Sequence, residues 1–130
     1  MTYRFDHDAV HGILRLSYIG QISDELIKQA YKATPAAVLK TNPRGMIIDL
    51  SEVTAFDVSP HTIHELADYQ PTVKDPSVPR IIVAPTPHLF GMSRMFQILG
   101  EHRRPMLRVV SSTDEAYAQL DVSQPEFKPF

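Results

Sequence analysis

The sequence predicts a single α/β domain, built on a mixed five-stranded sheet with about four helices. Three almost continuously apolar runs, at 45–50, 80–84 and 106–110, are typical of strands that are buried on both faces. Each run precedes a segment whose apolar residues have helical spacing. Two alternating segments at the N-terminus predict a hairpin, and the strand–helix units after it require parallel neighbours joined by helical crossovers.

The opening hairpin is predicted from period-two alternation at 3–7 and 13–18. The segment "QISDELIKQAYKA" then has apolar residues at helical spacing, with Ser23 as its predicted N-cap. Pro35 lacks the backbone N–H that a helix interior needs. We therefore expect the first helix to kink or end near Thr34.

Each of the three later helices has a hydroxyl residue at its predicted N-cap. These caps are Ser59, Thr86 and Ser112. Pro60 and Pro87 occupy the first helical position of two of them, where the missing N–H has no partner to lose. Gly100 ends the second of these helices. Residues 51–59 are predicted to form a loop between the central strand and the helix capped by Ser59.

Length and composition predict one domain. A chain of 130 residues with 43% hydrophobic content can bury a core without disulfide or metal support. We assign residues 1–120 to this domain and 121–130 to an irregular tail, because the tail is polar and broken by prolines. The chain has no cysteine, which excludes disulfides, thiolate catalysis and cysteine-based metal sites.

The net charge of −2 is spread along the chain and gives no electrostatic reason to expect a nucleic-acid partner. The one basic cluster, "EHRRPMLR", is short and is expected to be a solvated helix end. The N-terminus does not have the pattern of a signal peptide, and no apolar run reaches the roughly 18 residues that span a bilayer. We expect a soluble, cytoplasmic protein without integral membrane contact.

Three segments carry a resemblance to a known family. They are "MIIDLSEVTAFDVSPHTIHELADY", "RIIVAPTPHLFGMSRMFQIL" and "MLRVVSSTDEAYAQL". With the opening hairpin, they resemble over nearly the whole chain the SpoIIAA-like proteins. These belong with the STAS domains (sulfate transporter and anti-sigma-factor antagonist) and are related to Sec14-type lipid-binding folds. The resemblance implies a small bacterial protein of the cytoplasm, from a family whose members mostly lack an assigned activity, and it does not imply an enzyme.

In STAS phosphoswitches, the loop after the central strand reads roughly Asp-Ser-Ser-Gly, and the serine directly after the Asp is phosphorylated. The corresponding run here is Asp57, Val58, Ser59 and Pro60. Valine has no hydroxyl, so the acceptor position is missing. Ser59 lies one position later, where a phosphate is physically permitted at the positive end of a helix. We favour the interpretation of Ser59 as a helix cap and keep phosphorylation as the alternative.

The stretch "HTIHE" places His61 and His64 three residues apart on a helix, beside Glu65. Two neutral imidazoles suit zinc, but a third ligand is not evident in the sequence. We therefore predict no metal, no cofactor and no catalytic residue. A metal-dependent hydrolase built on His61, His64 and Asp57 is the alternative to a non-enzymatic protein.

The stretch "HLFGMSRMF" is the most unusual part of the chain. A glycine within a helix costs about 1 kcal/mol relative to alanine, so Gly91 indicates close packing or a ligand pressed against the backbone. Phe90, Met92 and Met95 offer soft apolar surface of the kind that binds variable partners. Arg94 lies among them. As an alternative, these side chains belong to the core, with Arg94 at its polar margin.

We predict a non-enzymatic regulatory or protein-interaction module of STAS type. Its partner is another protein or a second copy in a homodimer. The predicted binding surface combines the 51–59 loop, the start of the next helix and the helix that contains Gly91; its residues are Phe56, Asp57, Ser59, His61, Phe90, Gly91, Met92, Arg94 and Met95. The alternative function is a carrier or sensor of a lipid or other small apolar ligand, which requires an internal cavity of at least about 300 Å³.

Overall fold

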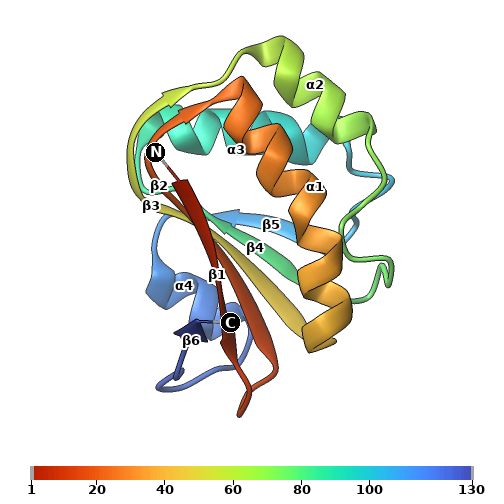
Figure 1. Cartoon of the computed structure of the whole chain (residues 1–130), viewed down its shortest axis with the longest axis vertical. Coiled ribbons are helices and arrows are strands. Elements are labelled where there is room, and N and C mark those ends of the chain that lie inside the picture. Colours follow the sequence, from red (N-terminus) through yellow and green to blue (C-terminus); the bar gives the residue numbers. More distant parts are fainter. Residues whose placement is uncertain (1, 130) are drawn as a thin grey trace.

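The structure is a computed structural model that describes residues 2–129, and its core is a six-stranded mixed sheet in the order β5-β4-β3-β2-β1-β6 (Figure 1). The strands are β1 (Thr2–Asp8), β2 (Ile13–Ser23), β3 (Gly45–Asp57), β4 (Arg80–Val83), β5 (Leu107–Val110) and β6 (Lys128–Pro129). The helices are α1 (Asp24–Thr41), α2 (Pro60–Asp68), α3 (Pro87–Leu99) and α4 (Thr113–Gln119). The predicted mixed α/β architecture with an opening hairpin is confirmed.

The sheet combines two kinds of pairing. β1 runs antiparallel to β2, as a hairpin requires, whereas β2, β3, β4 and β5 are parallel neighbours. α1, α2 and α3 supply the crossovers between these parallel strands. None of the helices within residues 2–129 combines the length and the apolar character that crossing a membrane requires.

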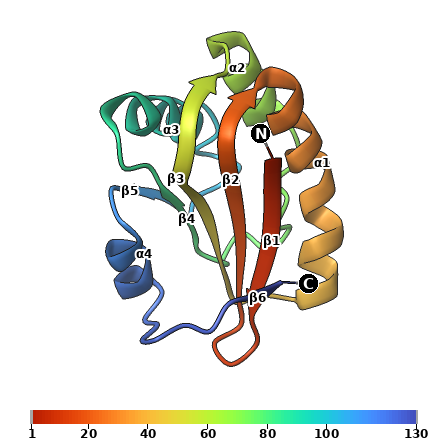
Figure 2. The same ribbon diagram turned by 60° about the vertical axis from the view of Figure 1, so that its left-hand side comes forward.

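Two hydrophobic cores lie on opposite faces of the sheet. α1, α2 and α3 cover one face, and α4 with the C-terminal segment covers the other (Figures 1 and 2). Met46, Leu50 and Ile82 face the first core, whereas Ile47 and Ile81 face the second. Because successive side chains of a strand point to opposite faces, strands covered on both sides are apolar throughout.

All four predicted helix caps are confirmed. In each case the side-chain oxygen accepts a hydrogen bond from a backbone N–H in the first turn: Ser23 from Leu26, Ser59 from Thr62, Thr86 from Leu89 and Ser112 from Glu115. Gly100 is the C-cap of α3, as predicted. These short-range signals therefore locate the starts of the helices correctly.

The prediction that the first helix kinks or ends near Thr34 is wrong, because α1 continues through Pro35 to Thr41. Pro35 is exposed, while Ala30, Thr34 and Ala37 are buried on the opposite side of the helix. The Thr34 hydroxyl also donates to the carbonyl of Ala30 at 2.7 Å. The stabilisation gained by burying this side of α1 thus exceeds the stabilisation lost with the one backbone hydrogen bond that proline removes.

The predicted 51–59 loop is also wrong, because β3 extends to Asp57 and pairs with the second half of β2. β4 accompanies β3 only as far as Asp49, so residues 51–57 have one strand neighbour and are mostly exposed. An exposed strand carries no apolar run, which is why the sequence pattern did not reveal it. Only Val58 and Ser59 separate β3 from α2.

The tail beyond Leu120 returns to the sheet. Lys128–Pro129 pairs antiparallel with β1, which gives six strands where the sequence predicted five. Phe127 packs against the second core, with the Arg15 guanidinium 4.0 Å above its ring centroid. Residues 121–127 contain no regular element, and residue 130 lies outside the described part of the chain.

Candidate functional site

The structure distributes the predicted binding residues between the surface of the protein and its interior. Asp57, His61, Gly91 and Arg94 are exposed. Five others are half-buried: Phe56, Ser59, Phe90, Met92 and Met95. The end of β3 and the start of α3 are neighbours, because His88 Nε2 lies 3.4 Å from the carbonyl oxygen of Phe56.

α3 has a solvent-facing side, which we call the α3 outer face and define as Pro87, Gly91, Arg94, Met95 and Ile98. These residues have helical spacing and are exposed or half-buried, with Ile98 at 58% exposure. A Cβ atom built on Gly91 has no neighbour within 4 Å among residues 2–129. Close packing within the chain, one of the two reasons proposed for this glycine, is therefore wrong.

Met92 and Phe90 do not share the α3 outer face. Met92 lies on the side of the helix toward the sheet and lines a partly open cavity together with Phe96. Phe90 is half-buried against the first core. Met95 is half-buried and also packs against the first core, but it does not line the cavity that Met92 reaches.

Ser59 is held as a helix cap by several hydrogen bonds. Its Oγ accepts from the N–H of Thr62 at 3.2 Å and donates to the hydroxyl of Thr62 at 3.1 Å. Its own N–H donates to Oδ1 of Asp24 at 2.8 Å, and this bond holds the pKa of Asp24 below its usual value. A phosphate on Ser59 would lie near the Asp24 carboxylate, so like-charge repulsion opposes it.

His61 takes part in an ion-pair network on the surface of α2. Its Nε2 lies 2.9 Å from Oε1 of Glu65, whose other carboxylate oxygen is 3.0 Å from Nζ of Lys28. The Lys28 ammonium lowers the pKa of Glu65. His64 is exposed, and within residues 2–129 no three histidine or acidic side chains gather as metal ligands do. The structure does not assemble the hydrolase site considered from the sequence.

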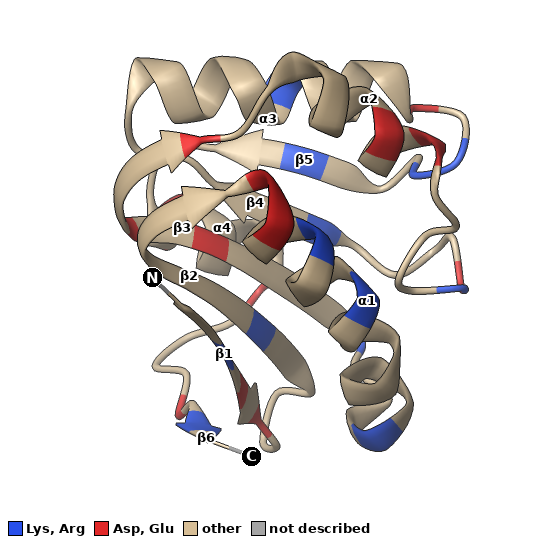
Figure 3. Cartoon of the chain, turned by 45° about the horizontal axis from the view of Figure 1, so that its top comes forward, with Lys and Arg blue, Asp and Glu red and all other residues tan. Residues whose placement is uncertain are grey.

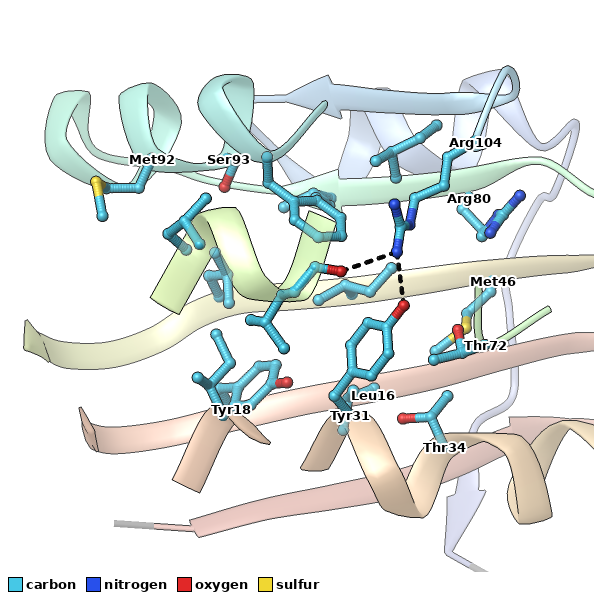
Figure 4. Close-up of a pocket in the computed structure, with 18 of the residues that line it drawn as sticks. Leu16, Tyr18, Tyr31, Thr34, Met46, Thr72, Arg80, Met92, Ser93 and Arg104 are labelled. Atoms are coloured by element: carbon cyan, nitrogen blue, oxygen red, sulfur yellow. Dashed lines mark hydrogen bonds between the residues drawn. The ribbon is translucent and has the colours of Figure 1, made fainter. Parts of the chain in front are cut away.

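A cavity of about 110 Å³ lies between the first face of the sheet and the helices α1, α2 and α3 (Figure 4). Most of its wall is apolar, and Phe56 and Met92 are the two predicted site residues that reach it. Two arginines, Arg80 and Arg104, also line it. The cavity is well below the volume of about 300 Å³ that the lipid-carrier alternative requires, so its size does not support that function.

Sequence reasoning missed both arginines. In the sequence, Arg80 falls within the apolar run at 80–84 and has no predicted role, and Arg104 falls within the predicted solvated helix end. Each is only 3% exposed, which corrects the second interpretation. The one available signal is that Arg80 directly precedes four apolar residues of a buried strand, where a charge is unusual.

Arg104 is fully engaged by the protein. Its Nη1 donates to the carbonyl of Ala67 at 3.0 Å, and its Nη2 donates to the carbonyls of Leu66 and Tyr69 at 3.1 Å. Nη2 also lies 2.6 Å from the hydroxyl of Tyr31, and the guanidinium stacks 4.6 Å from the ring centroid of Phe96. Arg104 thus places a cation at the negative end of the α2 dipole.

No protein-family model matches this chain, and no curated protein sequence matches it. Among solved structures, it is similar to the anti-sigma factor antagonist SpoIIAA in its unphosphorylated form, with a TM-score of 0.60 and 11% identity, covering 92% of this chain and 98% of that one. It is also similar to the phosphorylated form of the Bacillus cell fate determinant SpoIIAA, with a TM-score of 0.56 and 13% identity, covering 92% and 99%. The chain therefore has the SpoIIAA-like fold of STAS domains, as the resemblance in its sequence implied.

Proposed function

We propose that this protein is a non-enzymatic regulatory module that binds another protein through the α3 outer face and the adjoining start of α2. The fold supports this proposal, because it is shared with a protein described as an anti-sigma factor antagonist. The observation that carries it is Gly91. This glycine lies inside a helix, on its exposed side, with open space where a side chain would stand.

A glycine at this exposed position lowers the stability of the helix. Alanine at an exposed helical position is more favourable by about 1 kcal/mol, and none of the described residues prevents it at position 91. A partner whose surface approaches the helix backbone closely gives a reason for the missing side chain. Ile98 provides exposed apolar surface beside this point, and Met95, which is half-buried against the first core, lies at its margin. Apolar surface around a small residue suits a packed protein interface.

The charge distribution is compatible with a protein partner. Acidic and basic residues are interspersed over the helices and strands in the view of Figure 3. Arg94 provides a cation on the α3 outer face, and its guanidinium is hydrogen-bonded to Gln97. Arginine at the margin of an apolar patch is common in protein interfaces.

Binding in this proposal does not depend on phosphorylation of Ser59. One of the similar SpoIIAA structures is of a phosphorylated form. In this chain, the Ser59 hydroxyl caps α2 and the Asp24 carboxylate lies beside it. These contacts support a structural role for Ser59.

Photo-crosslinking in cells of the source organism tests the proposal. A photoreactive benzoylphenylalanine replaces Ile98, and in a control it replaces Ala118, which is exposed on α4 at the opposite face of the sheet. We expect a discrete protein adduct from position 98 alone. Its mass distinguishes a second copy of this chain from a different protein. Equal labelling at both positions, or no adduct at position 98, would contradict the proposal.

A further inference from the structure

β5 is an edge strand of the sheet. The strand order of residues 2–129 ends at β5, which pairs with β4 alone and lies between α3 and α4 (Figure 2). The carbonyl of Val110 accepts a hydrogen bond from the N–H of Ala84, just beyond the end of β4, at 2.9 Å. Because successive residues of a strand direct their backbone groups to alternate sides, Leu107 and Val109 direct theirs away from β4.

Val109 is the open position of this edge. The N–H of Leu107 donates to the carbonyl of Arg104 at 3.2 Å, and the carbonyl of Leu107 accepts from Nε2 of Gln97 at 2.8 Å. The backbone N–H and C=O of Val109 have no hydrogen-bond partner among residues 2–129. An extended chain that pairs with a sheet edge satisfies such groups, which is how proteins bind peptides by strand addition.

Two exposed arginines flank the open position. Arg108 precedes Val109 in β5, and Arg94 belongs to the α3 outer face. Gln97 connects the two elements, because it accepts a hydrogen bond from Arg94 and donates one to β5. The basic segments of α3 and β5 are both visible in Figure 3. Among residues 2–129, no carboxylate forms an ion pair with either arginine, so this edge suits an acidic chain.

A second copy of this chain does not match the charge of the edge. Antiparallel pairing of two β5 strands would place Arg108 of both copies on the same face of the shared sheet. Like charges on neighbouring strands are destabilising. Carboxylates on a different chain would instead lie beside Arg108 and Arg94, and opposite charges on neighbouring strands are stabilising.

We propose that the partner protein contributes an acidic extended segment, which adds to the sheet as a strand beside β5. This inference rests on the proposed function, because it names the chemistry of the partner next to the α3 outer face. The backbone of the segment pairs with the N–H and C=O of Val109. Its carboxylates lie at Arg94 and Arg108.

Calorimetric titration of the full chain with a synthetic peptide tests this edge. The probe is the peptide Thr-Val-Glu-Val-Glu-Val-Thr, acetylated and amidated at its ends, and we expect it to bind one-to-one. A control peptide with lysine in place of both glutamates is expected to bind at least about fivefold more weakly. A glutamate peptide with N-methyl groups on its central residues cannot pair as a strand, and we expect at least about tenfold weaker binding. Equal affinity for the probe and either control, or no binding of the probe at millimolar concentration, would overturn the inference.

Surface variants localise the binding. Arg108→Gln and Arg94→Gln each remove one cation beside the open position, and we expect each to lower the affinity for the glutamate peptide about two- to fivefold. Lys32→Gln removes the same charge from an exposed position on α1 and is expected to leave the affinity unchanged. Wild-type affinity in both arginine variants would show that the peptide binds elsewhere.

The peptide and the crosslinker at Ile98 fail separately. A protein adduct at Ile98 without binding of the glutamate peptide would leave the α3 outer face as the interaction surface and overturn the inference about β5. Peptide binding that depends on Arg108, without an adduct at Ile98, would support the acidic strand at β5 and contradict the proposed function. A dimer of the free protein that the peptide dissociates would also overturn the inference, because a second copy would then occupy the edge.

Discussion

The backbone N–H of Ser59 donates to the Asp24 carboxylate at 2.8 Å, and this bond ties the residue that caps α2 to the first residue of α1. Two helices that are separated by the whole of β3 thus begin at the same place. The carboxylate also lies where a phosphate on Ser59 would have to be accommodated. One contact therefore helps to position the helices and disfavours a phosphoserine switch.

Loss of the Ser59 hydroxyl is expected to destabilise the fold. Ser59→Ala removes the side-chain acceptor for the N–H of Thr62, and we expect the free energy of unfolding to fall by about 1 kcal/mol. Ser59→Thr keeps a hydroxyl and is the matched control. Urea denaturation of both variants measures the effect. Equal stability of the two would show that the cap contributes nothing.

Asp24 is expected to make stability depend on pH in the acid range. Its pKa in the folded protein is below the usual value of 3.8, because Ser59, Thr62 and Lys28 favour the charged form. The carboxylate therefore contributes stability fully above its unfolded-state pKa, and the contribution is lost as pH falls through the lower folded-state pKa. Asp24→Asn removes this contribution. Free energies of unfolding for wild type and variant, measured from about pH 7 to about pH 3, are expected to converge as pH falls; a constant difference would contradict the assignment.

The same substitution at two glycines of the α3 region is expected to have opposite effects. Gly91→Ala adds a methyl group in open space and should raise the free energy of unfolding by up to about 1 kcal/mol. Gly100→Ala places its methyl group against the Arg104 guanidinium, which four hydrogen bonds hold in place. We expect a loss of about 1–3 kcal/mol there. Thermal and urea denaturation of the pair measures both, and a loss at Gly91 would disprove the open position of that residue.

The two buried arginines are expected to differ in their effect on stability. Arg104→Met leaves the carbonyls of Leu66, Ala67 and Tyr69 without this donor, so we expect a loss of at least about 2 kcal/mol. Arg80→Met removes a buried charge whose Nε and Nη2 have no partner among the described residues, and we expect no loss in the free energy of unfolding. Urea denaturation compares the two variants. A larger loss for Arg80→Met than for Arg104→Met would mean that the protein itself neutralises Arg80.

Much of the fold could be predicted because its signals are local. Hydroxyl caps such as Ser59 and Thr86 depend on a few neighbouring residues, and strands covered on both faces form apolar runs. The extension of β3 to Asp57, the passage of α1 through Pro35 and the pairing of Lys128–Pro129 with β1 depend on distant packing. No local pattern in the sequence identifies the distant segments that pair or pack with these three.

The candidate site was less predictable than the fold for the same reason. The sequence identified Gly91 as unusual, but only the structure shows that its exposed side faces open space. Helical spacing alone did not separate Met95 on the outer face from Met92 at the cavity. The burial of Arg80 is set by β3, β5 and the helices packed over it, so the sequence of β4 alone does not reveal it.

The measurement that most directly tests the interaction surface is the crosslinking yield from position 98 in wild-type and Gly91→Ala backgrounds, at equal protein levels. If a partner approaches the helix backbone at Gly91, the added methyl group lowers the yield, although the protein alone becomes more stable. We expect a clear loss of the adduct together with a higher melting temperature. An undiminished yield in Gly91→Ala would contradict the central claim that this glycine is kept open for a protein partner.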